Sequence, residues 1–330
     1  EKGVAVQKGQ VAVVAEKIAF TTGKEDIGLR LDIVLSNHLQ LTRSAAARLV
    51  TEGKVLVDER QRKPSFKIMA GMHLQVHIED EGEPDTLRPY DIPLDILYED
   101  PWIIAINKPA GLVVHPGAGN KDKTLVNALI AHYPGILGVG NEERPGIVHR
   151  LDKLTSGVMV IAKNEQAYHA LIAAFKEHKH ARVYQGLCYG HMKQSTGQIK
   201  TFMQRHPTDR KKMSSKVSEG REAVTNWEVI EEWSQFSLLK LSLETGRTHQ
   251  IRVHLNDIGH PVVGDAQYGG KRQANNIIDP QIRSYVKSVD RQMLHAWMLG
   301  ITHPETGEWM EFSCEIPDDM KRFIEILDEQ

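Results

Sequence analysis

The stretch PGIVHRLDKLTSGVMVIAK, Pro145–Lys163, joins a polar loop directly to an apolar run. Residues 158–162 are apolar throughout and rich in β-branched side chains, which is typical of a strand buried on both faces. One carboxylate, Asp152, stands in the loop just before this strand. A loop anchored to a rigid strand is a common place for a catalytic group. The alternative is a solvated aspartate that caps a turn, and position alone favours that alternative.

The composition bounds the class of protein. With 330 residues the chain is long enough for two domains, and 41% hydrophobic with 25% charged residues is ordinary for a soluble globular protein. The formal net charge of −2, taken alone, argues against a nucleic-acid partner, because such proteins often carry a basic excess. A basic face can, however, be balanced by acidic segments elsewhere in the chain.

Cysteine and histidine spacing gives no sign of a disulfide or a metal. Cys188 and Cys314 lie far apart and form no CxxC pair, which fits a reducing cytoplasm. His249, His254 and His260 are spaced by five and six residues, which does not match the i, i+4 pair of a helical zinc site. We therefore expect core or hydrogen-bonding histidines and no metal site. No run approaches the roughly 18 apolar residues of a membrane span, so no membrane partner is expected.

Residues 24–78 are predicted to form a small domain. Helical spacing covers 31–38, and Thr42 is a candidate N-cap for a second helix over 43–51. A short strand at 54–57, a turn at Asp58-Glu59 and an alternating strand at 74–78 follow. Residues 1–23 are predicted to be an extension or a stray strand, and the acidic, proline-containing stretch 79–91 to be a linker.

Residues 92–330 are predicted to form a second, larger domain. Apolar or alternating runs predict strands over 102–106, 112–115, 182–190, 236–243 and 309–312. Helices are expected after Asn164 and from Thr248 to 258. In the strand 182–190, Arg182, Tyr184 and Gly186 share one face, which leaves room for a flat ring above Tyr184. A buried tyrosine that fills space is the alternative.

Two segments carry a basic excess. Residues 29–67 hold eight Lys or Arg against four acidic residues, and 200–216 hold six against one. His206-Pro207 and Ser214-Ser215 favour a mobile loop in the second segment. Either segment could bind phosphates, although a merely solvated surface is also consistent with charge alone. The candidate RNA-binding residues from these segments are Arg43, Arg48, Lys54, Arg210, Lys211 and Lys212.

The first segment resembles a known RNA-binding module. GLRLDIVLSNHLQLTRSAAARLVTEGKVLVD, Gly28–Asp58, is similar to the S4 domain, in which two helices precede a small twisted sheet. The resemblance implies that the second helix and the following strand contact structured RNA.

Five ordered segments of the larger domain resemble the RluA/RluD-type pseudouridine synthases. They are KPAGLVVHP (108–116), HRLDKLTSG (149–157), FKEHKHARVYQGLCYG (175–190), TGRTHQIRVHLNDIGHPVVGD (245–265) and LHAWMLGITHP (294–304). The resemblance implies an α+β fold with a mixed, largely antiparallel sheet flanked by helices and loops. It also implies an RNA isomerase that needs neither metal nor organic cofactor, and the S4-like domain in front favours large-subunit ribosomal RNA as the substrate. The cysteine usage fits the cytoplasm, and a monomer is expected by default.

The resemblance assigns roles to four residues. Asp152 would be the nucleophile that detaches uracil from ribose and lets it rejoin through carbon. Arg247 would pair with Asp152, and a neighbouring guanidinium favours the ionised form of a carboxyl group. Tyr184 would stack on the uracil. Arg150 would fill the gap that the flipped uridine leaves in the RNA.

One departure from the family pattern bears on Asp152. Family members usually carry an acidic residue where this chain has Leu154. Since no assigned chemistry depends on position 154, we expect activity to survive. The alternatives left open are a synthase acting on transfer RNA, a non-catalytic RNA-binding or ribosome-assembly protein, and a nucleosidase. The nucleosidase would need a second carboxylate near Asp152, and Leu154 removes the obvious candidate.

Overall fold

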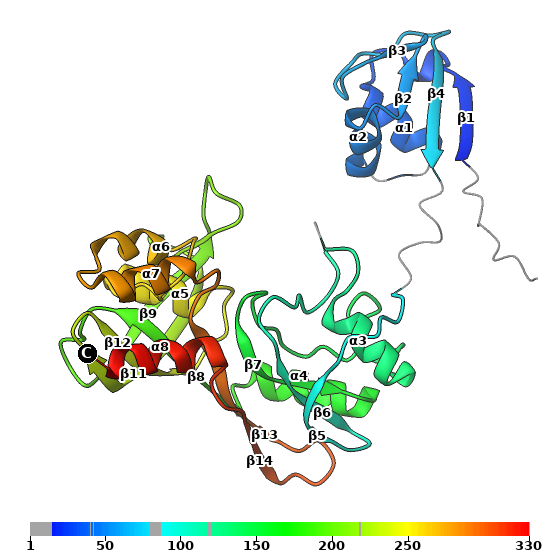
Figure 1. Cartoon of the computed structure of the whole chain (residues 1–330). Helices are drawn as coiled ribbons and strands as arrows, with labels where there is room; N and C mark the ends of the chain where they lie inside the picture. The colour runs from blue at the N-terminus through cyan, green and yellow to red at the C-terminus, as the bar shows by residue number, and fades with distance from the viewer. Residues whose placement is uncertain are drawn as a thin grey trace, which may run out of the picture. The chain divides into compact units, whose positions relative to one another are not determined.

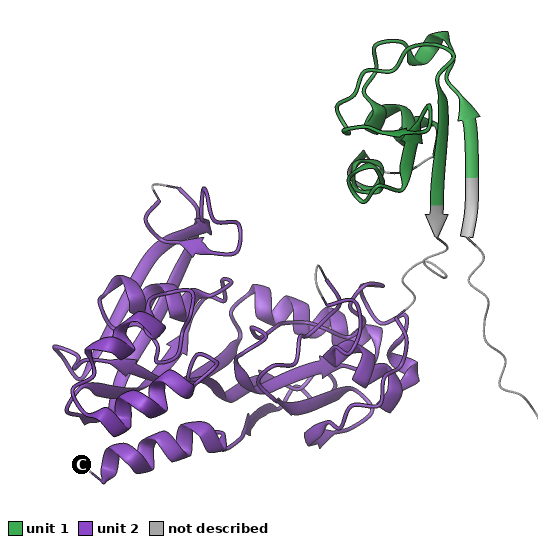
Figure 2. Ribbon diagram, turned by 45° about the horizontal axis from the view of Figure 1, so that its top comes forward, with its two compact units in different colours: residues 1–86 green, residues 87–330 purple. Residues whose placement is uncertain are grey.

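The chain divides after Thr86 into an N-terminal unit, residues 1–86, and a C-terminal unit, residues 87–330 (Figure 2). The computed structural model describes residues 15–39, 41, 43–79, 87–117, 120–217 and 219–329. Each unit has its own hydrophobic core. Each can therefore be described by itself.

The N-terminal unit packs two helices on a four-stranded antiparallel sheet of order β1-β4-β2-β3. Its elements are β1 (Ala15–Thr21), a 3-10 turn (Lys24–Asp26), α1 (Leu31–Leu39), α2 (Arg43–Thr51), β2 (Val55–Val57), β3 (Arg60–Gln61) and β4 (His73–Glu79). Leu31 and Leu35 of α1 are fully buried with Leu74 of β4. The predicted helices and strands are confirmed.

Two features of this unit differ from or extend the expectation. Strand β1 lies within the predicted extension 1–23 and pairs with β4 along its whole length, so the sheet begins at Ala15. Asp58 and Glu59 both have positive φ, 47° and 63°, as a two-residue hairpin between β2 and β3 requires. The predicted N-cap, Thr42, lies outside the described residues.

A ten-stranded sheet runs through the C-terminal unit in the order β10-β9-β11-β12-β8-β13-β7-β6-β5, with β14 paired to β13. The strands are β5 (Asp95–Glu99), β6 (Ile103–Lys108), β7 (Ser156–Ala162), β8 (His180–Tyr189), β9 (Thr196–Arg205), β10 (Met213–Ser214), β11 (Arg221–Trp233), β12 (Phe236–Leu243), β13 (Leu294–Thr302) and β14 (Trp309–Ser313). Among these pairings β13 with β7 is parallel and the others are antiparallel. The predicted mixed, largely antiparallel sheet is confirmed.

Helices cover this sheet in two groups (Figure 1). They are α3 (Leu125–His132), α4 (Glu165–Lys176), α5 (Gln250–Asp257), α6 (Gly270–Gln273), α7 (Pro280–Ser288) and α8 (Asp318–Asp328), with 3-10 turns at Pro134–Ile136 and Ala274–Asn276. Helices α3 and α4 lie beside β6 and β7, whereas α5, α6 and α7 lie together by β9. The predicted cap of α4 is confirmed, because Asn164 Oδ1 accepts a hydrogen bond from Ala167 N at 2.9 Å.

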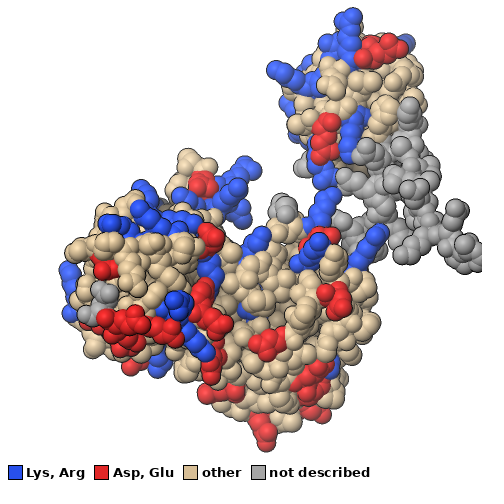
Figure 3. All heavy atoms as spheres, in the orientation of Figure 1, with Lys and Arg blue, Asp and Glu red and all other residues tan. Residues whose placement is uncertain are grey.

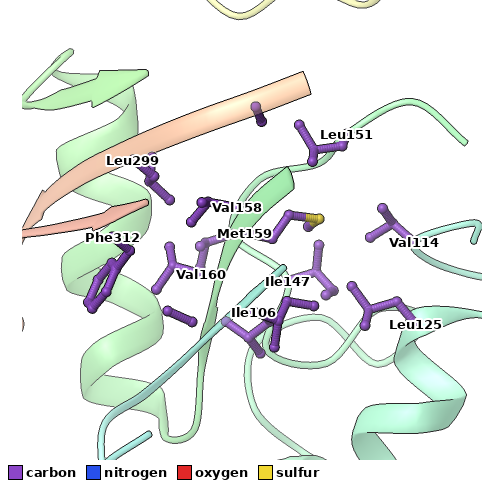
Figure 4. Packing of buried hydrophobic residues seen from close by; sticks show 14 of the residues in the cluster. Ile106, Val114, Leu125, Ile147, Leu151, Val158, Met159, Val160, Leu299 and Phe312 are labelled. Carbon is purple, nitrogen blue, oxygen red and sulfur yellow. The ribbon is translucent and has the colours of Figure 1, made fainter. Parts of the chain in front are cut away.

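Strand β7 lies at the centre of the larger core, and every one of its residues is buried. Its residues 158–160 lie among apolar side chains from β6, β13 and β14 (Figure 4). Leu151, from the loop before the strand, lies next to Met159 and is only 4% exposed. The residue directly before Asp152 is therefore anchored in the core.

Two predicted segments need correction. Residues 112–115 do not form a strand, because the carbonyls of Val113 and Val114 accept hydrogen bonds from the first amides of α3 instead of a neighbouring strand. In the basic segment 200–216, residues up to Arg205 extend β9: those up to Met203 pair with β11, and Gln204 and Arg205 pair with β10. The loop itself is confined to residues 206–212, between β9 and β10.

Candidate active site

Asp152 lies in a tight turn that three backbone contacts hold. Thr155 N donates to Asp152 O at 3.1 Å, and Gly111 N donates to Lys153 O at 2.8 Å. The buried Lys108 Nζ reaches Lys153 O at 3.3 Å as well as two carbonyls of its own loop, Pro109 O at 2.8 Å and Leu112 O at 3.0 Å. Burial lowers the pKa of Lys108 to about 7, yet three carbonyl acceptors match the three N–H bonds of an ammonium group. The hydrogen bonds from Lys108 and Gly111 thus fix the loop after Asp152.

Arg252, on α5, is the cation that faces the carboxylate. Its Nη1 donates to Asp152 Oδ2 at 3.0 Å, and its Nε and Nη2 donate to Asp265 at 2.7 Å and 3.1 Å. The Asp152 side chain keeps 20% exposure, whereas those of Arg252 and Asp265 are 5% and 0% exposed. Burial alone would lower the pKa of Arg252, but the hydrogen bonds and charges of Asp265 and Asp152 raise it. Asp265 therefore fixes the guanidinium, and the guanidinium positions Asp152.

The expected pairing of Arg247 with Asp152 is wrong. Arg247 Nε donates instead to Glu222 O at 3.0 Å, and the residue stands in the turn before α5. Arg247 still lines the pocket that contains Asp152. The reason for the difference is the helix: Arg252 lies on its inward face, three residues before the buried Leu255, and Arg247 precedes the helix.

A pocket of about 110 Å³ opens beside Asp152. Tyr184, on β8, is 8% exposed and forms part of its wall, as do Arg182 and Arg150. Burial raises the pKa of Tyr184, so its hydroxyl stays protonated at neutral pH. The volume admits several water molecules and hence a single flat ring. The structure thus brings Asp152, Tyr184, Arg150 and Arg247 to one pocket.

Arg182 is a second buried cation of this pocket. Its guanidinium packs against Gly246, where an added Cβ would lie 2.1 Å from Nη1. Its Nε is buried and has no hydrogen-bond partner among the described residues. Burial lowers the pKa of Arg182, yet an arginine remains charged at neutral pH. The pocket therefore offers donors and positive charge to a polar ligand.

His249 connects the pocket to the segment after α5. Its Nε2 lies 3.8 Å from Asp152 Oδ2, and its Nδ1 lies 2.8 Å from the Tyr268 hydroxyl, which accepts from Met213 N at 2.8 Å. His249 has a left-handed backbone, φ 57° and ψ 18°, which is uncommon for a residue other than glycine. Burial lowers the pKa of His249, against the attraction of Asp152. The neutral imidazole is therefore the expected form.

The sequence prediction did not assign Arg252 or Asp265 to the site, although a signal existed for Arg252. His249 was expected only in a core or hydrogen-bonding role, and it is hydrogen-bonded to the Tyr268 hydroxyl. In the helix predicted from Thr248, the apolar Leu255 is expected to face the core, and a residue three positions earlier shares that face. An arginine on an inward face has to be paired, because an unpaired buried charge is costly. His254, by contrast, has the core role that was expected, with Thr201 and Thr225 hydroxyls 2.9 Å from its ring nitrogens.

The other candidate RNA-binding residues do not line this pocket. In the N-terminal unit, Arg43 pairs with Asp32 at 3.2 Å, and Arg48 and Lys54 lie 3.8 Å and 3.6 Å from Glu52. In the loop between β9 and β10, Arg210 and Lys211 are exposed and Lys212 lies 3.6 Å from Asp209. Lys and Arg side chains gather along the upper side of the C-terminal unit in Figure 3, and Asp and Glu along its lower side.

Leu154 does not line the catalytic pocket but a different one, together with Arg291 and Asp319. Its carbonyl accepts from Arg291 Nη1 at 3.4 Å, and Arg291 is paired with Asp319 at the start of α8 through two hydrogen bonds of 2.5 Å and 2.6 Å. Asp319 thus provides a carboxylate that pairs with Arg291, although residue 154 is apolar. The loop keeps this contact without an acidic side chain at position 154.

Comparisons with known proteins identify the family. The profile of the RNA pseudouridylate synthase family matches residues 102–257, and that of the S4 domain matches residues 29–74. The chain is 41% identical over 313 residues to ribosomal large subunit pseudouridine synthase D of Escherichia coli strain K12, covering 94% of each chain. The chain belongs to the RNA pseudouridylate synthase family.

Further relatives of this family extend the likeness. An RNA pseudouridine synthase of Aquifex aeolicus is 43% identical over 321 residues, covering 96% of this chain and 98% of the relative. Human RNA pseudouridylate synthase domain containing 1, a solved structure, superposes with a TM-score of 0.53 at 25% identity, covering 76% of this chain and 98% of the human one. The chain is thus an RNA pseudouridine synthase, an isomerase, with an S4 domain at its N-terminus. Among the described residues, no helix is long and apolar enough to cross a membrane.

Proposed function

We propose that this synthase converts specific uridines of large-subunit ribosomal RNA to pseudouridine, with Asp152 as the nucleophile. The observation that carries the proposal is a carboxylate held by Arg252 at 3.0 Å in a pocket walled by an aromatic ring. A fixed, oriented carboxylate is ready to attack without reorganising. The name of the Escherichia coli relative and the S4 domain support ribosomal RNA as the substrate.

The reaction is an isomerisation in which no atom is gained or lost overall. The bond between uracil N1 and the ribose breaks, a bond between C5 and the ribose forms, C5 loses its proton and N1 gains one. Asp152 assists the detachment, and Tyr184 stacks on the uracil while it turns. Arg247, at the pocket rim, contacts the bound nucleotide. This chemistry draws on side chains alone, so we propose that no cofactor or metal takes part.

The uridine has to leave its helix to enter the pocket. Arg150 is exposed and lines the pocket mouth, and we propose that it fills the place the base leaves. The cations of the N-terminal unit and of the loop 206–212 then contact RNA phosphates. These cations are Arg43, Arg48, Lys54, Arg210, Lys211 and Lys212. We propose a cytoplasmic monomer whose partner is RNA.

The experiment that tests the substrate class measures tritium release from RNA labelled at uracil C5. In vitro transcripts of bacterial large-subunit ribosomal RNA and of transfer RNA are each incubated with the enzyme, and release is expected from the ribosomal transcript. Release from transfer RNA alone would reassign the substrate. No release from either RNA, together with tight binding, would favour a non-catalytic RNA-binding protein.

A further inference from the structure

A second pocket adjoins the active site and takes no part in the chemistry described above. It has a volume of about 230 Å³ and lies between the loop preceding β10 and helices α5 and α6. Lys212, Lys216 and Arg272 line it, as does His206. Asp257 is its one acidic lining residue among those described, and its carboxylate is bonded to the Ser215 hydroxyl. The lining is therefore cationic.

These cations are available to a ligand. Lys216 and Arg272 have no acidic partner among the described residues, and Arg272 is exposed. Lys212 lies 3.6 Å from Asp209 in a half-exposed pair, which is weak in water. His206 Nδ1 accepts from Asp209 N at 3.1 Å, so a neutral His206 carries its proton on Nε2 and offers a further donor. Such a set of donors suits an anion.

One layer of residues separates this pocket from the catalytic one. Gln267 and Tyr268 line the second pocket. Gln267 Oε1 accepts from Arg252 Nη2 at 2.7 Å, and the Arg252 guanidinium lies 5.0 Å from the centre of the Tyr268 ring. Arg252 in turn holds Asp152. A nucleic-acid strand whose uridine occupies the catalytic pocket therefore passes close to the second one.

We propose that the second pocket binds a backbone phosphate of the RNA strand next to the target uridine. The proposal rests on the proposed function, since the phosphate belongs to the same substrate. Lys216 and Arg272 neutralise the phosphate, and Lys212 closes over it from the loop.

The test is phosphate-ethylation interference on a large-subunit ribosomal RNA transcript, combined with binding measured over a salt series. The variant is Lys216→Gln with Arg272→Gln, and the matched control is Lys193→Gln with Lys287→Gln, two exposed lysines outside both pockets. The wild type and the control should show interference at one or two adjacent phosphates that the pocket variant does not show. The slope of log K against log salt should fall by about 1 for each phosphate that the pocket variant no longer binds.

The outcomes separate this proposal from the proposed function. We expect the pocket variant to have a raised KM, with kcat for tritium release within about threefold of wild type. An unchanged interference pattern and salt slope in the pocket variant would overturn the phosphate site, even if the enzyme is active. Equally weakened binding in the pocket variant and the control would also overturn it, because it would indicate diffuse charge attraction. Failure of the proposed function would instead appear as no tritium release by the wild type.

Discussion

At the scale of single residues, the arrangement around Asp152 depends on Arg252. This guanidinium uses three of its nitrogens to bind two carboxylates and Gln267, and its side chain is 5% exposed. The planar fork of an arginine matches two carboxylates at once, which a lysine cannot do. Arg252 is therefore a positioning residue for Asp152.

We predict that Arg252→Gln lowers kcat far more than Arg247→Gln does. Removal of the hydrogen bond at 3.0 Å frees the Asp152 carboxylate to move, and a displacement of about 1 Å can lower a rate about 100-fold. The glutamine also leaves the Asp265 carboxylate buried without its cation, which costs about 3–5 kcal/mol of stability. Single-turnover kinetics and urea unfolding of both variants and of Arg252→Lys check this.

A kinetic defect without a stability defect in Arg247→Gln would fit its place at the pocket rim. The result that would contradict the role of Arg252 is a stable Arg252→Gln protein with the wild-type kcat. Arg252→Lys, which keeps the charge but not the fork, should recover part of the stability and little of the rate.

The sequence predicted the nucleophile candidate, the aromatic wall and the basic loop, because each shows in local pattern or in family resemblance. It did not predict which of two nearby arginines pairs with Asp152. That pairing depends on where α5 begins and on Asp265, thirteen residues beyond Arg252, and local pattern does not fix such a contact. The carboxylate that pairs with Arg291 beside Leu154 likewise comes from a distant residue, Asp319.

At the scale of elements, the pairing of β7 with β13 fixes the catalytic loop. Gly157, at the start of β7, has φ +119°, and a Cβ there would lie 2.2 Å from Ala296 O. Only glycine permits both the backbone conformation and the close approach. The parallel pairing of β7 with β13, which joins the two halves of the sheet, is confined to Ser156 and Gly157 of β7.

We predict that Gly157→Ala destabilises the protein by about 3 kcal/mol or more, since backbone strain and overpacking each cost about 1–3 kcal/mol. The matched control is Gly138→Ala, where φ is +91° but nothing lies within 4 Å of the added Cβ. The control carries the strain alone and should be destabilised by about 1–3 kcal/mol. Denaturant unfolding of both variants gives the difference, and equal destabilisation would show that the close approach to β13 contributes nothing.

Strand and helix positions were mostly predictable, because burial on both faces and capping leave local signals. Residues 112–115 were mispredicted as a strand. An apolar β-branched run can offer its carbonyls to the first amides of a helix, as it does here to α3, as well as to a neighbouring strand. A strand within residues 1–23 was predicted only as an alternative to an extension, because the partner of β1, strand β4, lies more than fifty residues away in the chain.

At the scale of the whole molecule, buried histidines make stability depend on pH. Burial lowers the pKa of His149 to about 3 and those of His180, His254 and His295 to about 4. Each is neutral in the folded protein at pH 5, whereas the unfolded chain binds protons near pH 6.5. The unfolded state thus binds more protons between pH 6.5 and about 4, so stability falls as the pH falls through that range.

We predict that the free energy of unfolding decreases by up to about 1.4 kcal/mol per pH unit for each such histidine below pH 6.5. His254→Gln should reduce this slope by the contribution of one proton, whatever the effect of the substitution on stability at pH 8. Urea unfolding at a series of pH values from 8 to 5 measures the slopes of the variant and the wild type. Parallel curves for the two proteins would mean that His254 is not held neutral by the fold.

The central claim is that Asp152 performs the chemistry. The most direct measurement compares tritium release from C5-labelled ribosomal RNA by the wild type and by Asp152→Asn, which preserves the side-chain shape and an oxygen for Arg252. We predict that release falls at least about 1,000-fold while RNA binding and unfolding are unchanged. Release by Asp152→Asn within about tenfold of the wild-type rate, or about 1.4 kcal/mol in barrier, would contradict the role of Asp152 as the nucleophile.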